Sequence, residues 1–149
     1  MVDCRYEPLP VETSQRRNPT AAPYTHRNLR EVEDSAARFG FGETQETRFA
    51  NDDLETEQTG FSHHRIKPGR RQPFGHRHER AEEVYVVISG SGRVKLDDEI
   101  LDVQELDAVR VSPGVIRAFE AGERGLEILA FGPRLPADRG EIIQGWWAD

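Results

Sequence analysis

Apolar residues are unevenly distributed along this chain of 149 residues. Val, Ile, Leu and Phe are sparse before Gly60 and dense between Val84 and Phe131, which places the expected core in the second half. The segment 83–89 (EVYVVIS) is rich in β-branched and aromatic residues, as is typical of a strand. Further short strands are predicted at 44–50, 60–67, 93–96, 100–103, 108–111, 115–120 and 126–131. Because turn residues separate these segments, the pattern indicates an all-β sandwich or barrel.

The first part of the chain has a different character. Residues 1–27 are rich in Pro, Thr, Arg and Asn and predict an extended arm. Asn28 and Glu31 are spaced as a helix cap and its capping-box partner, and Gly40 would end a short helix. We therefore expect an N-terminal arm with one short helix at 1–42, a barrel at 43–135 and a tail at 136–149. The tail contains Trp146 and Trp147, an apolar pair expected to pack on the barrel.

The strand at 83–89 is apolar on both faces. Glu83, Tyr85 and Val87 alternate with Val84, Val86 and Ile88. A strand of this kind is covered on both sides. One face is expected to line the barrel, and the other to meet a second sheet, the arm or another subunit, which favours a homodimer.

Net charge and cysteine content indicate which binding partners and which cellular compartment are expected. The formal net charge is −7, which argues against binding to nucleic acid or to anionic lipid. Cys4 is the single cysteine, so a reducing compartment is expected. The first ten residues do not resemble a signal peptide, and no apolar run is long enough to span a membrane. These features predict a cytoplasmic protein.

The candidate chemistry lies in one segment. Two histidines, His76 and His78, are spaced so that both side chains point to one face of a strand. Glu83 follows after a short turn and could supply a third ligand to the same ion. Two His and one carboxylate with open positions is the facial-triad pattern, and the divalent ion would be Fe, Mn, Ni or Zn. The alternative for a bare His-x-His is a pair of surface histidines in a charged loop.

The surroundings favour the metal site, because they resemble the two sequence motifs of the cupin superfamily. The first motif corresponds to Gly69, His76, His78, Glu83 and Gly90. The second corresponds to Asp107, Val109 and Val111, followed by Ser112-Pro113-Gly114. Together they cover roughly half of the chain, residues 60–131. The resemblance implies a small single-domain protein with the cupin double-stranded β-helix, a jelly-roll barrel, but no particular activity.

This sequence departs from the cupin pattern at the second motif. Arg117 occupies the position of the family's last metal-binding histidine, and Leu106 that of a glycine. In one interpretation, three ligands keep the metal and Arg117 grips an anionic substrate beside it. In the other, the metal is lost and Arg117 pairs with Glu83. We favour the first, because three protein ligands are enough for catalytic metals.

Other residues of the expected pocket follow from alternation along 61–67. Either His63 and Arg65 face inward, or His64 and Ile66 do. Cupins that resemble oxalate decarboxylase carry an active-site arginine at the position of Arg65, which would place His63 and Arg65 inside as a proton carrier and a substrate ligand. Tyr85 would share the face of Glu83 and is the other candidate for moving a proton.

A basic cluster surrounds this segment. It either steers an anionic ligand or forms a solvated rim paired with acids, and it comprises Arg65, Lys67, Arg70, Arg71, Arg77 and Arg80. The sequence thus predicts a metal-dependent enzyme that acts on a small anionic molecule, and the resemblance to cupins implies an oxygenase, decarboxylase or isomerase without choosing among them. The alternative is a non-catalytic binding or sensor cupin.

Overall fold

The computed structural model describes residues 22–147 and is built mainly from antiparallel strands. Two short helical segments come first, the 3-10 helix η1 (Leu29–Glu31) and the helix α1 (Ser35–Arg38). The strands then follow in chain order: β1 (Gln45–Phe49), β2 (Thr59–Ile66), β3 (Gly75–Arg77), β4 (Glu83–Leu96), β5 (Glu99–Gln104), β6 (Ala108–Val111), β7 (Arg117–Pro133) and β8 (Glu141–Ile143). No helix in this part of the chain is long and apolar enough to cross a membrane.

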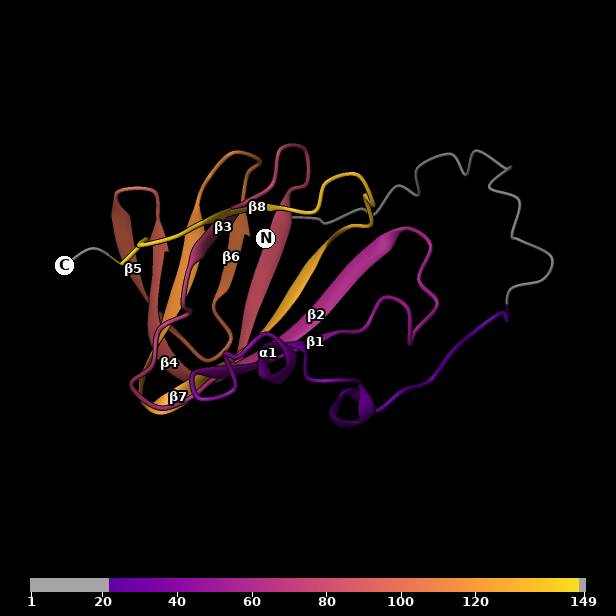
Figure 1. Cartoon of the computed structure of the whole chain (residues 1–149), viewed down its shortest axis with the longest axis horizontal. Helices are drawn as coiled ribbons and strands as arrows, with labels where there is room; N and C mark the ends of the chain where they lie inside the picture. The colour runs from indigo at the N-terminus through magenta and orange to yellow at the C-terminus, as the bar shows by residue number, and fades with distance from the viewer. Residues whose placement is uncertain (1–21, 148–149) are drawn as a thin grey trace, which may run out of the picture.

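The strands form one sheet that curls into a barrel (Figure 1). Its main path runs β1-β2-β7-β3-β8, while β4 pairs with β5, β6 and β7. β7 is the central strand, because its second half pairs with both β2 and β4 and its first half pairs with β3 and the end of β4. This arrangement confirms the predicted all-β class and the jelly-roll barrel.

β4 and β7 are longer than the sequence pattern predicted. Each was expected as two strands, yet each runs without a break through a glycine-containing segment. The register between them shifts at Val87/Ser89 and again at Gly90/Gly92, so β4 bends there without leaving the sheet. A Cβ atom on Gly92 would lie 2.0 Å from the carbonyl oxygen of Glu120, which explains why glycine is needed at this close approach.

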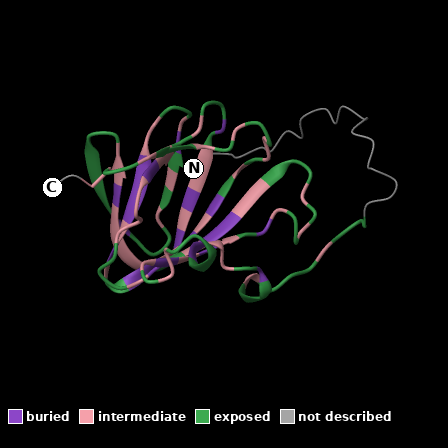
Figure 2. Ribbon diagram, viewed as in Figure 1, coloured by how far each residue is buried: buried purple, intermediate pink, exposed green. Residues whose placement is uncertain are grey.

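The core fills the inside of the barrel (Figure 2). Phe119, Val94 and Ile66 are almost completely buried there, and they pack with further apolar side chains from β4, β6 and β7. The inward position of Ile66 sets the direction of every side chain on β2, since successive residues of a strand point to opposite faces.

The N-terminal segment differs from the single helix predicted between Asn28 and Gly40. Asn28 caps η1 as expected, but Val32 is extended and Asp34 starts a separate helix, α1. The Asp34 side chain accepts hydrogen bonds from the backbone N–H of Ala36 and of Thr47, so the same carboxylate caps α1 and ties it to β1. Residues 1–21 of the predicted arm at 1–27, with Cys4, lie outside the described residues.

The C-terminal segment runs across the open end of the barrel. β8 pairs with β3, and the Nζ of Lys95 donates a hydrogen bond of 2.8 Å to the backbone oxygen of Trp146. Trp147 donates its indole N–H to the carbonyl oxygen of Gln72 at 3.1 Å. A Cβ atom on Gly75 would lie 2.7 Å from the Trp146 ring, so the first residue of β3 is packed directly against the tail.

Candidate functional site

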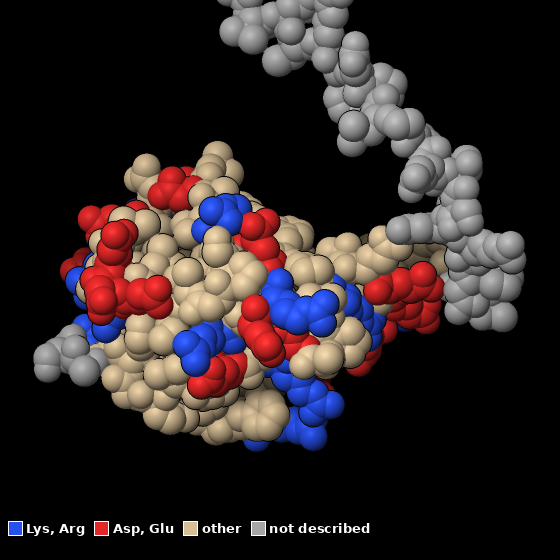
Figure 3. Space-filling model, turned by 90° about the horizontal axis from the view of Figure 1, so that it is seen from above, with Lys and Arg blue, Asp and Glu red and all other residues tan. Residues whose placement is uncertain are grey.

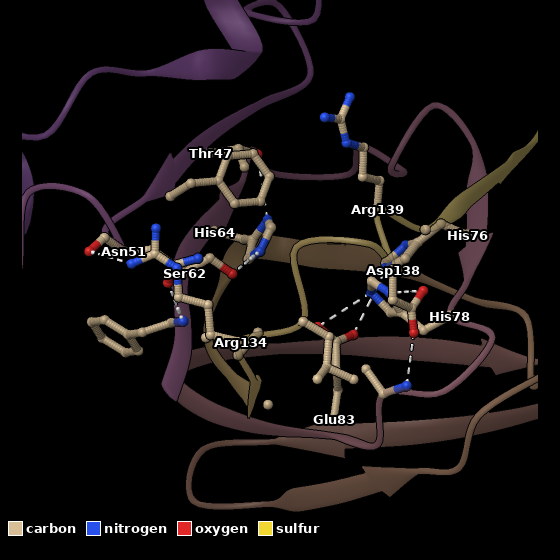
Figure 4. A pocket seen from close by; sticks show the side chains of 18 of the residues that line it. Thr47, Asn51, Ser62, His64, His76, His78, Glu83, Arg134, Asp138 and Arg139 are labelled. Atoms are coloured by element: carbon tan, nitrogen blue, oxygen red, sulfur yellow. Dashed lines mark hydrogen bonds and ion pairs between the residues drawn. The ribbon is translucent and has the colours of Figure 1, made fainter. Parts of the chain in front are cut away.

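The predicted ligands His76, His78 and Glu83 converge on one point (Figure 4). His76 lies within β3, His78 follows that strand directly, and Glu83 is the first residue of β4. The Nε2 atom of His78 lies 3.5 Å from Oε1 of Glu83, and Nε2 of His76 lies 3.7 Å from Oε2. One potential ligand atom from each residue falls within 4.8 Å of the other two.

Asp138, in the loop before β8, fixes the orientation of His78. Its Oδ1 lies 3.2 Å from Nδ1 of His78, and its two oxygens accept hydrogen bonds from the backbone N–H of Glu79, Arg80 and Ala81. Burial would raise the pKa of Asp138, but these donors hold it well below its usual range. A neutral His78 that donates Nδ1–H to this carboxylate presents the lone pair of Nε2 to Glu83, whereas a protonated His78 donates Nε2–H to Glu83 as well.

Glu83 is held from behind by Arg117 and Tyr85. Nη2 of Arg117 donates to Oε2 of Glu83 at 2.8 Å, and the Tyr85 hydroxyl donates to the same oxygen. Nε of Arg117 donates to the Tyr85 oxygen at 3.0 Å, and Nη1 donates to the carbonyl of Val115 at 2.8 Å. The bonds among Arg117, Tyr85 and Glu83 close a ring at Oε2 and leave Oε1 directed at His78.

The contacts around Glu83 favour its ionised carboxylate and shift the pKa of both histidines. Burial would raise the pKa of Glu83, but hydrogen bonds from His76, His78 and Tyr85 and the charge of Arg117 lower it far below its usual range. The hydrogen bond with Glu83 raises the pKa of His78, whereas burial lowers the pKa of His76. Lone pairs of His78 and Glu83 that face each other at 3.5 Å require a proton or a cation between them.

This donor set fits a divalent metal. Two ligand atoms bound to one ion at about 2.1 Å lie about 3.0–3.5 Å apart in octahedral or tetrahedral geometry. The pair formed by His78 Nε2 and Glu83 Oε1 already has such a separation. Two imidazoles and a carboxylate suit Fe, Mn, Ni or Zn, and the Asp138–His78 contact is the carboxylate–histidine pairing that commonly supports a ligand histidine.

The site lines a cavity of about 510 Å³ at the open end of the barrel. The opposite wall carries Thr47, Ser62 and His64, and Phe74 contributes an aromatic surface. Arg139 lies at the exposed rim of the cavity, and no carboxylate among the described residues forms an ion pair with it. The cavity therefore combines the three candidate ligands with polar, aromatic and basic surfaces.

The expectation that His63 and Arg65 face the pocket is wrong. Nε2 of His63 lies 2.6 Å from Oε1 of Glu127 on the outer face of β2, and Arg65 is largely exposed and lies 3.7 Å from Glu46. Because Ile66 points into the core, alternation directs His64, not His63, toward the cavity. The sequence contained this signal, since an isoleucine is the residue of that segment best suited to the core.

The expected substrate-binding role of Arg117 is also not supported. Its side chain is completely buried, all three guanidinium nitrogens are bonded within the protein, and it does not line the cavity. Tyr85 reaches the cavity wall, but its hydroxyl is bonded to Glu83, and burial raises its pKa beyond the usual range. Arg117 and Tyr85 therefore position Glu83.

Half of the predicted basic cluster, namely Arg65, Arg71 and Arg77, forms ion pairs with acidic side chains. Arg71 pairs with Glu120, and Arg77 pairs with Glu141 at 2.6 Å. Figure 3 shows basic and acidic side chains intermixed over the face seen from above, without a continuous basic surface. Of the two interpretations of this cluster, the structure favours the rim paired with acids.

Comparison with known proteins agrees with the barrel fold described above. The family model of the cupin domain matches residues 62–131. A cupin protein from Bacteroides fragilis superposes with a TM-score of 0.61 and 21% identity over 76% of this chain and 86% of its own. The polyketide cyclase RemF from Streptomyces resistomycificus gives a TM-score of 0.66 and 17% identity over 81% of this chain and 84% of its own. No curated protein matches the sequence significantly.

A larger enzyme has a higher sequence identity to this chain than these two structures. A variant of oxalate decarboxylase from Bacillus subtilis is 30% identical with a TM-score of 0.53, over 60% of this chain. The match covers 25% of that enzyme's chain. These superpositions show that the curled sheet is the double-stranded β-helix of cupins.

Proposed function

Because this chain belongs to the cupin superfamily, we propose that it is a metal-dependent enzyme that acts on a small organic molecule. The convergence of His76, His78 and Glu83 on the wall of a cavity large enough for such a molecule carries the proposal. Polyketide cyclase and oxalate decarboxylase, whose folds this chain resembles, are enzymes by name.

The three residues would hold Fe, Mn, Ni or Zn and leave coordination positions open to a ligand. When bound, the ion would supply Lewis-acid or oxygen-activating chemistry of the kind used by oxygenases, decarboxylases and isomerases. Asp138 keeps the Nδ1–H of His78 occupied so that Nε2 is available as a ligand atom. Arg117 and Tyr85 occupy Oε2 of Glu83, which leaves Oε1 as the free carboxylate oxygen.

We retain the proposal of an anionic substrate, with Arg139 in place of Arg117 as the residue that binds its anionic group. Arg139 is the exposed guanidinium at the rim of the cavity, whereas Arg134, also in the lining, is bound to Asp52 at 2.6 Å. A guanidinium binds carboxylate or phosphate with two parallel hydrogen bonds. Arg139 would thus hold the anionic end of the substrate near the mouth.

A second candidate function is a non-catalytic binding or sensor cupin. The observation that favours it is the ion pair between Arg117 and Glu83 at 2.8 Å, which places a fixed positive charge beside the carboxylate that would bind the metal. Two cations that share one carboxylate repel each other, so this pair weakens metal binding.

A homodimer is the proposed assembly. Val84, Val86 and Ile88 lie on the outer face of β4 and are partly exposed, and Phe131, which pairs with Val84 in register, extends this apolar surface onto β7. An apolar sheet face of this kind is commonly covered by a partner. Light scattering after size exclusion tests it, and a monomer at micromolar concentration would refute it.

Metal analysis tests the main proposal. The untagged protein is purified, and its content of Fe, Mn, Ni and Zn is measured beside the variants His76→Ala and His63→Gln. His63 is the matched control, because it is a buried histidine on the outer face of β2. We expect near-stoichiometric metal in the wild type and in His63→Gln, and its loss in His76→Ala. If the wild type takes up none of the four ions even when they are added, the binding or sensor function replaces the enzyme.

A further inference from the structure

His64 is a cavity histidine that the metal centre does not use. Its Nε2 lies 2.9 Å from the hydroxyl oxygen of Ser62, and its Nδ1 lies 3.3 Å from that of Thr47. Thr47 and His64 are directly opposite each other on β1 and β2, and Ser62 is two residues before His64 on the same face. Both ring nitrogens therefore meet a hydroxyl group at the cavity wall.

The cluster carries no charge near neutral pH. Burial, followed by the nearby His76, lowers the pKa of His64 from 6.5 to about 4. A neutral imidazole has one N–H and one lone pair, so one hydroxyl accepts a hydrogen bond from the ring and the other donates one to it. The accepting hydroxyl keeps its own hydrogen as a donor toward the cavity, and the donating hydroxyl keeps lone pairs as an acceptor.

We propose that Thr47, Ser62 and His64 form an uncharged subsite that binds a hydroxyl or carbonyl group of the cavity's ligand. The cluster lies across the cavity from His76 and His78 (Figure 4). This inference rests on the proposed function, because it names a further contact of the molecule whose anionic end Arg139 would hold beside the metal centre. The substrate is then a small molecule that joins an anionic group to a neutral oxygen group.

The surroundings of the cluster support a neutral group rather than a second anion. A carboxylate there would lack a cationic partner within the cluster, and a buried charge without one is strongly disfavoured. The ring of Phe49 stands edge-on to His64 with centroids 6.1 Å apart, and it adds an apolar surface beside the hydroxyls. The subsite thus suits an oxygen atom attached to a carbon skeleton.

The test uses phenol and toluene, two probes of similar size that differ in the hydroxyl group. Both are titrated into metal-free protein while the imidazole nitrogens of His64 are observed by NMR. We expect phenol to shift the His64 signals more than toluene does. The ratio of phenol to toluene affinity should fall about 3- to 10-fold in Ser62→Ala or Thr47→Val, as the loss of a neutral hydrogen bond predicts.

The control is His63→Gln, which changes the outer face of the same strand and should leave the ratio unchanged. Equal shifts of His64 with both probes, or an unchanged ratio in both variants, would overturn the proposal, as would benzoate perturbing His64 more than phenol. The first comparison needs only the wild type, so it does not depend on folding of a variant. Because the protein is metal-free, failure of the metal-site proposal is scored separately by metal content.

Discussion

Arg117 offers the most direct test of the network behind the metal site. Arg117→Met keeps much of the buried aliphatic length but removes the charged hydrogen bond to Glu83, the bond to the Tyr85 oxygen and the donor to the Val115 carbonyl. The bond to Glu83 is worth about 1.5–3 kcal/mol. Breaking a buried pair by removing one partner costs about 3–5 kcal/mol in total, because the other charge stays behind.

The assay is urea denaturation at neutral pH in the presence of a chelator. We expect the free energy of unfolding of Arg117→Met to fall by about 3–5 kcal/mol. When Zn²⁺ replaces the chelator, it should stabilise the variant more than the wild type, since the freed Glu83 carboxylate no longer shares its charge with a guanidinium. A loss below about 1 kcal/mol would refute the reasoning, because that is the range of an exposed ion pair.

A milder variant keeps this test informative if Arg117→Met does not fold. Tyr85→Phe removes only the hydroxyl that links Arg117 to Glu83. We expect a loss of about 1–2 kcal/mol in the same denaturation experiment. An unchanged free energy of unfolding in this variant would show that the closed ring around Glu83 does not stabilise the fold.

Three further predictions concern other parts of the chain. Asp138→Asn should weaken Zn²⁺ binding about 10- to 100-fold by calorimetry, since His78 loses its carboxylate partner, and equal affinity would contradict this role. The folded pKa of His64, about 4, lies below the unfolded value of 6.5, so the folded state binds fewer protons between these pH values. The contribution of neutral His64 to the free energy of unfolding is therefore complete above pH 6.5 and is lost as the pH falls to 4, by up to about 3 kcal/mol in urea denaturation. An equally steep loss in His64→Phe would exclude protonation of His64 as the cause. Leu106→Gly should raise the free energy of unfolding by about 0.5–1 kcal/mol, because Leu106 has φ 70° and is 80% exposed, whereas a decrease would show that its side chain matters.

The strands and the three candidate ligands could be predicted because both depend on local spacing. Alternating apolar residues define the segments from β4 to β7, and His76, His78 and Glu83 are close together in the chain. The inward face of β2 was ambiguous, because histidines occupy both alternating sets and only Ile66 distinguishes them. Alternation states which residues share a face and leaves open which face is inside.

The partners of the ligands could not be predicted from the sequence. An arginine at position 117 can bind a substrate or a neighbouring carboxylate, and its burial, a property of the packed barrel, decides between them. Asp138 is a single acidic residue in a loop without periodicity, and it lies 60 positions from His78. Contacts at such separations depend on how the tail crosses the barrel, for which the sequence contains no local signal.

The position of the tail has a consequence for biosynthesis. His76, His78 and Glu83 leave the ribosome before residues 138–147, yet β3 needs β8 as a hydrogen-bonded neighbour and His78 needs Asp138. A chain whose residues 138–147 have not yet packed against β3 therefore has unsupported ligand histidines. The candidate site is completed only once the tail has been translated and has packed on the barrel, so a metal ion encounters the site in its final geometry only after that step.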